Sequence, residues 1–334
     1  MEFLENISLK HFNTFGIEAR AEKFCEFTNT EELTEALSAS SDMPSLILGG
    51  GSNVLLTQDI SGVVLRNAIP GIETVKDDGD KVLIRSGAGE SWHDLVLYAV
   101  ERGFGGIENL SLIPGSVGAA PMQNIGAYGV EIKDVFQSLE AMYIPSGELH
   151  RFTAEDCKFG YRESIFKREL KGQYVITSID LELRRNSELN TSYGAIEQEL
   201  QRLGKEADIK SISEAVINIR RSKLPDPAII GNAGSFFKNP VIEKMEFETL
   251  LKDFPEIPNY PAPSGRKLAA GWLIEQAGWK GKDLGGYGVH DRQALVLVNR
   301  GGATGEKLFQ LSEDILTSVK DKFGVQLERE VNVI

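Results

Sequence analysis

Residues Ile113–Gly129 read IPGSVGAAPMQNIGAYG, with four glycines, two prolines and no charged side chain. Such a segment is too rich in glycine for a helix and too long for a tight turn. Glycine lets backbone amides approach a ligand closely because no Cβ intervenes, and Gln123, Asn124 and Tyr128 can hydrogen-bond it without adding charge. This glycine segment predicts an inner wall around a flat or phosphorylated ligand, with a structural Ω-loop as the alternative.

The bulk composition describes an acidic chain without targeting or membrane signals. Its 334 residues suffice for two or three domains, and its formal net charge is −13. That charge disfavours nonspecific binding to nucleic acid or anionic membranes, so an anionic small substrate would need a local cationic pocket. No apolar run resembles a signal peptide or reaches the length of a membrane span. We expect a cytoplasmic protein, with Cys25 and Cys157 as reduced thiols and no metal-ligand spacing among the four histidines.

Strand and helix signals alternate on both sides of the glycine segment. Upstream, Ser45–Leu48 predicts a buried strand that ends in the loop Gly49–Asn53, and Ser91–Glu101 predicts a helix. The other expected elements are a helix over Thr28–Ala39 opened by a capping box at Thr28 and Glu31, a hairpin of Val135–Ile144 and Glu148–Phe152, a strand over Tyr174–Leu183, helices over Ser211–Lys223, Lys267–Ala277 and Thr304–Phe323, and strands over Ala294–Asn299 and Val325–Ile334.

The loop Gly49–Asn53 is a candidate pyrophosphate site. Consecutive backbone amides at a strand end form an anion-binding nest, and Ser52 and Asn53 add side-chain donors. The loop matches neither G-x-G-x-x-G nor the Walker pattern, so a tight turn is an equally good interpretation.

Three polar side chains elsewhere could act on a substrate. Arg162 could clamp a carboxylate with two parallel bonds, although an arginine next to Glu163 is more often a surface ion pair. Ser235 lies between a glycine and two phenylalanines, where its hydroxyl could donate a proton or simply belong to a turn. Glu330 falls on the polar face of the last expected strand, for which a solvated strand face is the simpler interpretation. Taken together and in this order, they indicate an active site.

The ordered set of segments resembles the UDP-N-acetylenolpyruvoylglucosamine reductases of bacterial peptidoglycan synthesis. The resemblance spans nearly the whole chain, and Thr191–Gly194 falls where one subtype carries a substrate tyrosine on an inserted loop. The matching segments are Asn13–Gly16, Leu48–Asn53, Ile113–Gly129, Gly160–Arg162, Lys223–Pro227, Gly231–Pro240, Lys267–Ile274, Gln293–Val296 and Leu327–Val331.

The resemblance implies an α+β fold of three domains and a monomeric protein. Two domains would form the FAD-binding fold of vanillyl-alcohol-oxidase (PCMH-type) flavoenzymes. We expect residues 1–69 to form the first FAD-binding subdomain and residues 70–217 the second, with the tyrosine loop inserted in it. Residues 218–334 would form the substrate-binding domain.

The resemblance also implies the reaction. NADPH would reduce a noncovalently bound FAD, after which UDP-N-acetylglucosamine enolpyruvate would take its place and be reduced to UDP-N-acetylmuramate. Hydride from flavin N5 would add to the enolpyruvyl double bond, so that negative charge develops toward the carboxylate. Arg162 matches the family's catalytic arginine, Ser235 its proton donor and Glu330 its catalytic glutamate.

The same match carries over ligand-binding positions. Tyr193, Lys223, Asn239 and Gln293 match substrate contacts. The FAD pyrophosphate would lie on Gly50, Gly51, Ser52 and Asn53, and the flavin along Ser116, Gly126, Ala127 and Tyr128.

Two other functions remain open from the sequence. One is a flavin oxidase of the same fold acting on an alcohol or sugar. Such oxidases often attach FAD through histidine, and neither glycine loop contains histidine, which favours noncovalent FAD. The other is a non-catalytic nucleotide-sugar-binding protein, which would stay colourless with FAD.

Overall fold

The computed structural model describes residues 2–43 and 45–334, and the chain divides into two compact units. Each unit draws on segments that are distant in the sequence. The first contains Met1–Ile7, Ala21–Gly50 and Ile60–Ser222. The second contains Ser8–Arg20, Gly51–Asp59 and Lys223–Ile334.

The first unit begins with a small sheet in the order β1-β2-β5-β3. Strand β5 pairs in parallel with both β2 and β3, as the alternating strand and helix signals require. Helix α1 buries Leu33 and Ala36 in a cluster with Phe27 and Leu65 of this sheet. The bounds are β1 Leu4–Ser8, β2 Arg20–Phe27, α1 Thr30–Ala39, β3 Ser45–Leu48 and β5 Ile60–Asn67.

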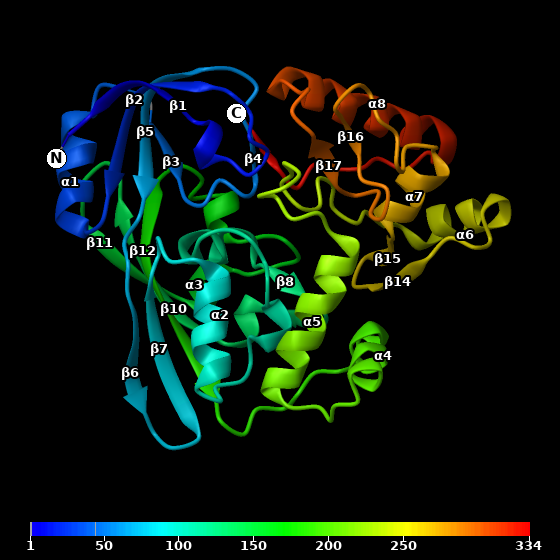
Figure 1. Cartoon of the computed structure of the whole chain (residues 1–334), viewed down its shortest axis with the longest axis horizontal. Helices are drawn as coiled ribbons and strands as arrows, with labels where there is room; N and C mark the ends of the chain where they lie inside the picture. The colour runs from blue at the N-terminus through cyan, green and yellow to red at the C-terminus, as the bar shows by residue number, and fades with distance from the viewer. Residues whose placement is uncertain (1, 44) are drawn as a thin grey trace. The chain divides into compact units, whose positions relative to one another are not determined.

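A second sheet, in the order β11-β10-β12-β7-β6, carries the larger core of this unit. All its neighbouring strands are antiparallel. Helix α2 lies along the sheet (Figure 1) and buries Trp92 and Leu95 with Ile84 and Leu181. The bounds are β6 Ile72–Asp77, β7 Lys81–Gly87, α2 Trp92–Glu101, β10 Phe136–Tyr143, β11 Leu149–Thr153, α3 Ala154–Cys157 and β12 Tyr174–Arg184.

The glycine segment lies between α2 and β10 and contains no α-helix. It forms two single 3₁₀ turns, Val117–Ala119 and Pro121–Gln123, followed by the two-residue strand β8, Gly126–Ala127, which pairs with β9, Val130–Glu131. A pair of helices, α4 (Gly194–Leu203) and α5 (Ile209–Lys223), completes the unit around a separate apolar cluster.

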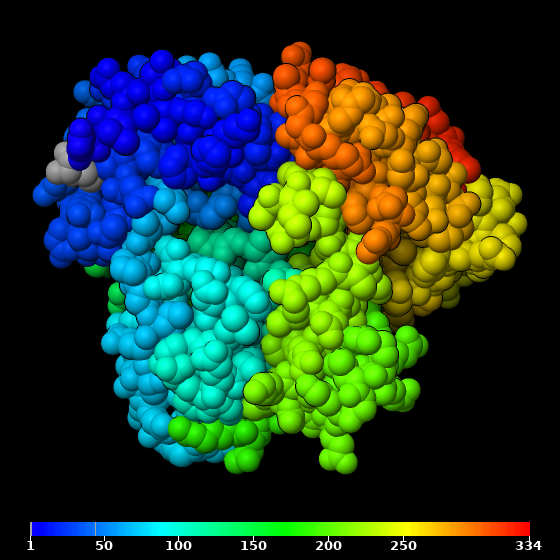
Figure 2. Space-filling model, in the orientation of Figure 1, coloured from blue at the N-terminus to red at the C-terminus, as the bar shows by residue number. Residues whose placement is uncertain are grey.

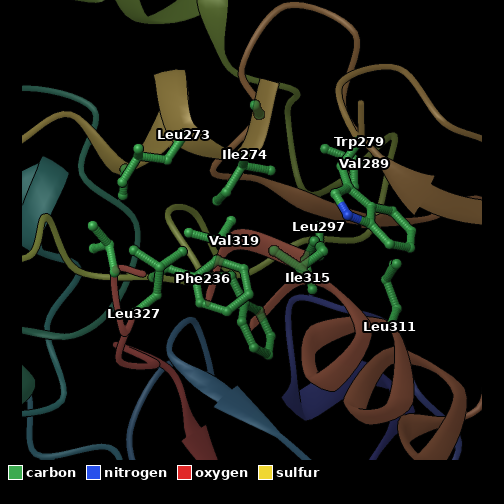
Figure 3. Close-up of a cluster of buried hydrophobic side chains, with 14 of the residues drawn as sticks. Phe236, Leu273, Ile274, Trp279, Val289, Leu297, Leu311, Ile315, Val319 and Leu327 are labelled. Atoms are coloured by element: carbon green, nitrogen blue, oxygen red, sulfur yellow. The ribbon is translucent and has the colours of Figure 1, made fainter. Parts of the chain in front are cut away.

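The second unit has a single large apolar core. Figure 3 shows Phe236 among Leu273, Ile274, Val319 and Leu327, which come from three other segments. Strand β18 pairs in parallel with β4. The bounds are β4 Val54–Leu55, β13 Val241–Ile242, α6 Lys244–Asp253, β14 Asn259–Ala262, β15 Gly265–Leu268, α7 Ala270–Gln276, β16 Tyr287–Val289, β17 Leu297–Asn299, α8 Gly305–Phe323 and β18 Asn332–Val333.

The capping residues of two helices differ from those expected. Helix α1 is capped by Asn29, whose side chain accepts from Glu32 N, while Thr28 N donates to the Glu32 carboxylate. In α5, Asp208 and Ser211 exchange the reciprocal bonds, so the helix begins at Ile209.

Two other elements are shorter than expected. Residues 267–268 belong to β15, which pairs on both sides with β13 and β14, so the helix expected there begins only at Ala270. The segment expected as a strand over Val325–Ile334 does bury Val325, Leu327 and Val331 on one face. Its regular pairing is limited to β18, because its other partner is a short stretch between Gly234, with φ +68°, and Pro240.

Candidate active site

The glycine segment and its surroundings hold the backbone in strained conformations. Among the described residues, six non-glycine residues have positive φ. Four of these lie in or beside the glycine segment: Leu112 (+59°), Asn124 (+46°), Tyr128 (+50°) and Arg162 (+55°). Such conformations cost energy and gather where a structure serves a ligand, so this strain points to a functional segment.

The glycine loop after β3 approaches the glycine segment at backbone distance. A Cβ on Gly50 would lie 3.1 Å from Gly115 Cα and 3.2 Å from Ser116 N, both of them backbone atoms. Ser116 itself is only 6% exposed. A side chain at Gly50 would be crowded here, and the contact brings Gly50 of the first candidate cofactor loop against the second.

Arg162 is fixed by the glycine segment. Its Nη2 donates to the Gly126 carbonyl at 2.6 Å, and a Cβ on Gly126 would lie 3.1 Å from its Nη1. Glu163, the partner considered for a surface ion pair, lies 3.1 Å from Arg168 Nε. Arg162 is thus held as an oriented guanidinium next to a glycine carbonyl.

Tyr128 connects the glycine segment to the two terminal helices of the first unit. Its ring meets the Tyr193 ring edge-on, with centroids 5.2 Å apart, and packs against the α4–α5 cluster. Burial raises the pKa of Tyr128, and its hydroxyl accepts a hydrogen bond from Arg220. Tyr193 directly precedes α4, whose segment is green at the surface in Figure 2, and it keeps 50% of its surface exposed.

Arg220 is a residue of this site that sequence reasoning missed. Its Nε donates to the carbonyl of strained Leu112 at 3.2 Å, while Leu112 N donates to His93 Nδ1 at 3.0 Å. Desolvation lowers the pKa of Arg220, and Tyr128 opposes that shift. Arg220 lies in α5, on the face of the helix that otherwise points inward. A cation at such a position is the sequence signal that could have revealed Arg220.

In the second unit, Ser235 and Glu330 lie on either side of one buried residue. Phe236 N donates to the Leu295 carbonyl at 2.8 Å, and the Phe236 carbonyl accepts from Glu330 N at 2.8 Å. Phe236 and Phe237 are both buried in one core, whereas Ser235 is only half-buried. The core therefore fixes the backbone that carries the Ser235 hydroxyl.

The remaining predicted substrate residues of the second unit have different environments. Asn239 Oδ1 accepts from Ala270 N at 3.0 Å, which leaves its NH₂ as a donor for a ligand. Gln293 Oε1 accepts from Leu295 N at 3.3 Å, so Gln293 adjoins the segment that pairs with Phe236. Lys223 is exposed at the end of α5, and Asn53 Nδ2 lies 3.4 Å from the Glu330 carbonyl.

The donor groups of the glycine loops suit a dinucleotide cofactor. Gly50 and Gly115 leave the backbone accessible, Ser116 offers a hydroxyl, and neither loop contains an acidic side chain that would repel a pyrophosphate. Within residues 2–43 and 45–334, no group of three or more His, Cys, Asp or Glu side chains could hold a metal ion. Across the same residues, every helix is too short or too polar to span a bilayer.

Comparison with known proteins assigns the chain to a class. Residues 21–153 match the family described as FAD binding domain. Together with the mixed α+β fold and the two glycine loops, this defines an FAD-binding oxidoreductase of the PCMH-type fold.

The family follows from closer relatives. Residues 226–334 match the C-terminal domain of UDP-N-acetylenolpyruvoylglucosamine reductase. Proteins of that name from Flavobacterium johnsoniae and Chromobacterium violaceum are 52% and 48% identical, over 100% and 99% of this chain and 100% and 98% of theirs. The crystal structure of the Thermus caldophilus reductase matches with a TM-score of 0.67 at 25% identity, covering 99% of this chain and 98% of that one. The chain belongs to the UDP-N-acetylenolpyruvoylglucosamine reductases, the FAD-dependent oxidoreductases of peptidoglycan precursor synthesis.

Proposed function

We propose that this protein reduces UDP-N-acetylglucosamine enolpyruvate to UDP-N-acetylmuramate, with NADPH as the electron donor and FAD held noncovalently. The observation that carries this proposal is the pairing of Ser235 and Glu330 through the Phe236 backbone, in a chain of this family. A hydroxyl and a carboxyl group fixed by one buried residue suit a reaction that ends in proton transfer. We expect the protein to act on these substrates in the cytoplasm and as a monomer.

We propose a cofactor site in which backbone amides and small side chains hold the dinucleotide. Bound FAD would supply the hydride chemistry. The close approach of Gly50 to Gly115 and Ser116 supports this site, because it brings backbone of the two glycine loops together. The proposed contacts are Gly50, Gly51, Ser52 and Asn53 for the pyrophosphate, and Ser116, Gly126, Ala127 and Tyr128 along the flavin.

Ser235 is the proposed proton donor. A serine hydroxyl is a weak acid, but a carbon-centred enolate is a strong base, so transfer from Oγ to carbon is feasible. The burial of Phe236 and Phe237 supports the role, because it fixes the backbone on which the hydroxyl is carried.

Arg162 and Glu330 are the proposed electrostatic groups. A guanidinium stabilises charge that develops on the substrate carboxylate, and its planar fork suits that geometry. The bond from Arg162 to the Gly126 carbonyl supports this role, because it orients the side chain before a substrate binds. Glu330 would hydrogen-bond the developing enediol when protonated, or orient Arg162 when ionised.

Four further residues are the proposed substrate contacts: Tyr193, Lys223, Asn239 and Gln293. Tyr193 would place the protein in the subtype with a tyrosine loop. The exposed Tyr193 ring and the unengaged NH₂ of Asn239 support these roles. We keep the division into FAD-binding subdomains 1–69 and 70–217 and a substrate-binding domain 218–334 as a proposal.

An anaerobic assay tests the proposed function. Purified protein with FAD should oxidise NADPH only when UDP-N-acetylglucosamine enolpyruvate is present, and one UDP-N-acetylmuramate should form per NADPH consumed. Oxidation of NADPH that requires oxygen and ignores the sugar would instead support an oxidase of the same fold.

A further inference from the structure

Asn109 lies fully buried beneath two segments of the first unit and bonds to both. It belongs to the single 3₁₀ turn Glu108–Leu110 and is 0% exposed. Its Nδ2 donates to the Tyr128 carbonyl at 3.0 Å and to the Asn190 carbonyl at 2.9 Å. One amide group therefore joins the glycine segment to the segment that precedes Tyr193.

The Asn109 side chain uses its amide nitrogen for both bonds of this link. Its Oδ1 is buried and accepts no hydrogen bond from the described residues. An unsatisfied buried acceptor costs stability, so the amide is not an optimised part of the core. Two backbone carbonyls require two donors from one side chain, which asparagine provides and aspartate does not.

Two routes lead from Asn109 to Tyr193. Along the chain, the Asn190 side chain accepts from Ser192 N at 3.1 Å and from Ser192 Oγ at 2.7 Å, which shapes the turn entering Tyr193. Through space, the Tyr128 ring packs edge-on against the Tyr193 ring. Asn190 Nδ2 also donates to the Gly129 carbonyl at 3.0 Å, which joins the two segments a second time.

The segment before Tyr193 has room to move if these bonds are lost. A cavity of about 860 Å³ borders Asn190, Thr191 and Ser192 on one side and Gly129 on the other. Residues 190–192, which precede α4, belong to no helix or strand, and none of them is fully buried. The amide bonds therefore set their position.

We propose that Asn109 is a positioning residue that couples the glycine segment to Tyr193. The part of this inference that concerns substrate rests on the proposed function, in which Tyr193 contacts the nucleotide sugar. The coupling itself rests only on the bonds of Asn109 and Asn190. A ligand that fixes Tyr128 also fixes Tyr193, and a ligand held by Tyr193 stabilises the glycine segment.

Amide hydrogen exchange on the FAD-loaded protein tests the coupling without any assay of activity. Asn109→Ala should speed exchange at residues 128–129 and 190–193 together, while helix α5 stays protected. Asn186→Ala, which alters an exposed asparagine of the same connection, should leave both segments unchanged. Faster exchange throughout the unit, or at only one of the two segments, would overturn the proposal.

Two further variants keep the test decisive. Asn190→Ala removes the bond to Gly129 from the exposed side and should reproduce the paired effect even if Asn109→Ala does not fold. Asn109→Asp keeps the shape but turns an acceptor toward two carbonyls, so it should loosen both segments at least as much. Protection that persists in both variants would contradict the coupling.

Steady-state kinetics tests the link to substrate. Asn109→Ala and Tyr193→Ala should each raise KM for the enolpyruvyl sugar by roughly tenfold, and the double variant should be no worse than Tyr193→Ala. Additive losses would mean that Asn109 does not act through Tyr193. If the unaltered protein does not turn over this sugar, the proposed function fails, while the exchange experiment still decides the coupling.

Discussion

The proposed catalytic residues are Ser235, Arg162 and Glu330. Each is held in place by a neighbouring group that has no proposed role in the reaction. Ser235 is carried by the backbone of a buried phenylalanine, and Glu330 bonds to that same backbone. Arg162 is held by a glycine carbonyl. The reactivity that we propose for the three groups therefore depends on where their neighbours hold them.

Replacing Ser235 should separate the two half-reactions. Ser235→Ala should leave reduction of the flavin by NADPH nearly unchanged, because no proton goes to carbon in that step. Turnover of the enolpyruvyl sugar should fall by roughly 10²–10⁴-fold, the usual contribution of a positioned acid. Stopped-flow absorbance of the flavin measures both steps, and equal losses in both would refute the assigned role.

Changing the two charged groups should slow the same step. Arg162→Lys keeps the charge but loses the planar fork, and Glu330→Gln removes the ionisable group without changing size. Both variants should slow oxidation of the reduced flavin by the sugar more than its reduction by NADPH. Rapid mixing of reduced enzyme with the sugar provides the comparison, and a variant slowed chiefly in the NADPH step would be misassigned.

The elements provide these positions through close backbone contact and through buried polar pairs. One example is the contact between the loop after β3 and the glycine segment. Another is Asp180 of β12, which accepts from Arg85 Nε at 2.8 Å, Ser138 Oγ at 3.0 Å and Arg151 Nη2 at 3.1 Å. The first contact joins the two proposed cofactor loops, whereas the second holds β7, β10, β11 and β12 together.

Enlarging Gly50 should weaken FAD binding. A methyl group there meets the backbone of Gly115 and Ser116, which cannot move as a flexible side chain would. Overpacking of this kind corresponds to a loss of roughly tenfold or more in affinity for Gly50→Ala. Quenching of flavin fluorescence in a titration measures it. Gly194→Ala, where an added Cβ meets open space, is the matched control and should bind FAD normally.

The Asp180 pair should make the stability of the first unit depend on pH. Burial is the largest single effect and would raise the pKa of Asp180, but the hydrogen bonds and charges of Arg85, Ser138 and Arg151 together hold that pKa below its usual range. A lowered carboxyl pKa contributes stability above the unfolded value near 3.9, and that stability is lost as pH falls through the folded pKa.

Asp180→Asn should therefore destabilise the protein near neutrality by about 2 kcal/mol, a reduced value because both arginines are partly exposed. Urea unfolding at pH 7 and pH 3 measures the loss, which should shrink at the lower pH. Asp77→Asn, which breaks an exposed pair with Arg185, should have little effect at either pH. A loss for Asp180→Asn that is equal at both pH values would contradict this account.

Local sequence signals predicted the elements whose causes are local. Thr304 caps α8 and Gly324 ends it, as their residue types indicate. The segment Val325–Ile334 was predicted as a long strand because apolar and polar residues alternate along it. Its pairing, however, depends on a partner segment that is bounded by Gly234 and Pro240. Asn109 could not be predicted, since nothing in the sequence indicates which distant carbonyls a buried side chain will meet. Arg220 was missed although a cation on the inward face of a helix was a signal for it.

At the scale of the whole molecule, the family and the PCMH-type fold were correctly predicted from the ordered motifs. Residue-by-residue assignments of the site remain proposals, because motif order fixes which residues are present and not what they touch. The grouping of Ser8–Arg20 and Gly51–Asp59 with Lys223–Ile334 was not foreseen, since it depends on contacts between residues far apart in sequence.

FAD should be released when the protein unfolds. Neither glycine loop contains histidine or cysteine to which FAD could be attached, so acid precipitation should leave a colourless pellet and a yellow supernatant. Before precipitation, saturating FAD should raise the unfolding temperature, by mass action on the folded state. Yellow colour that stays in the washed pellet would indicate a covalent link and would favour an oxidase.

The pairing of β4 with β18 has a consequence for how the chain is made. Asn53 and Glu330, which flank this pair, are 277 residues apart. Leu55 and Leu56, fully enclosed in the finished protein, leave the ribosome long before their neighbours exist. Until residues 223–334 follow, these two leucines therefore lack the partners that cover them, and a chaperone would find them exposed in this interval.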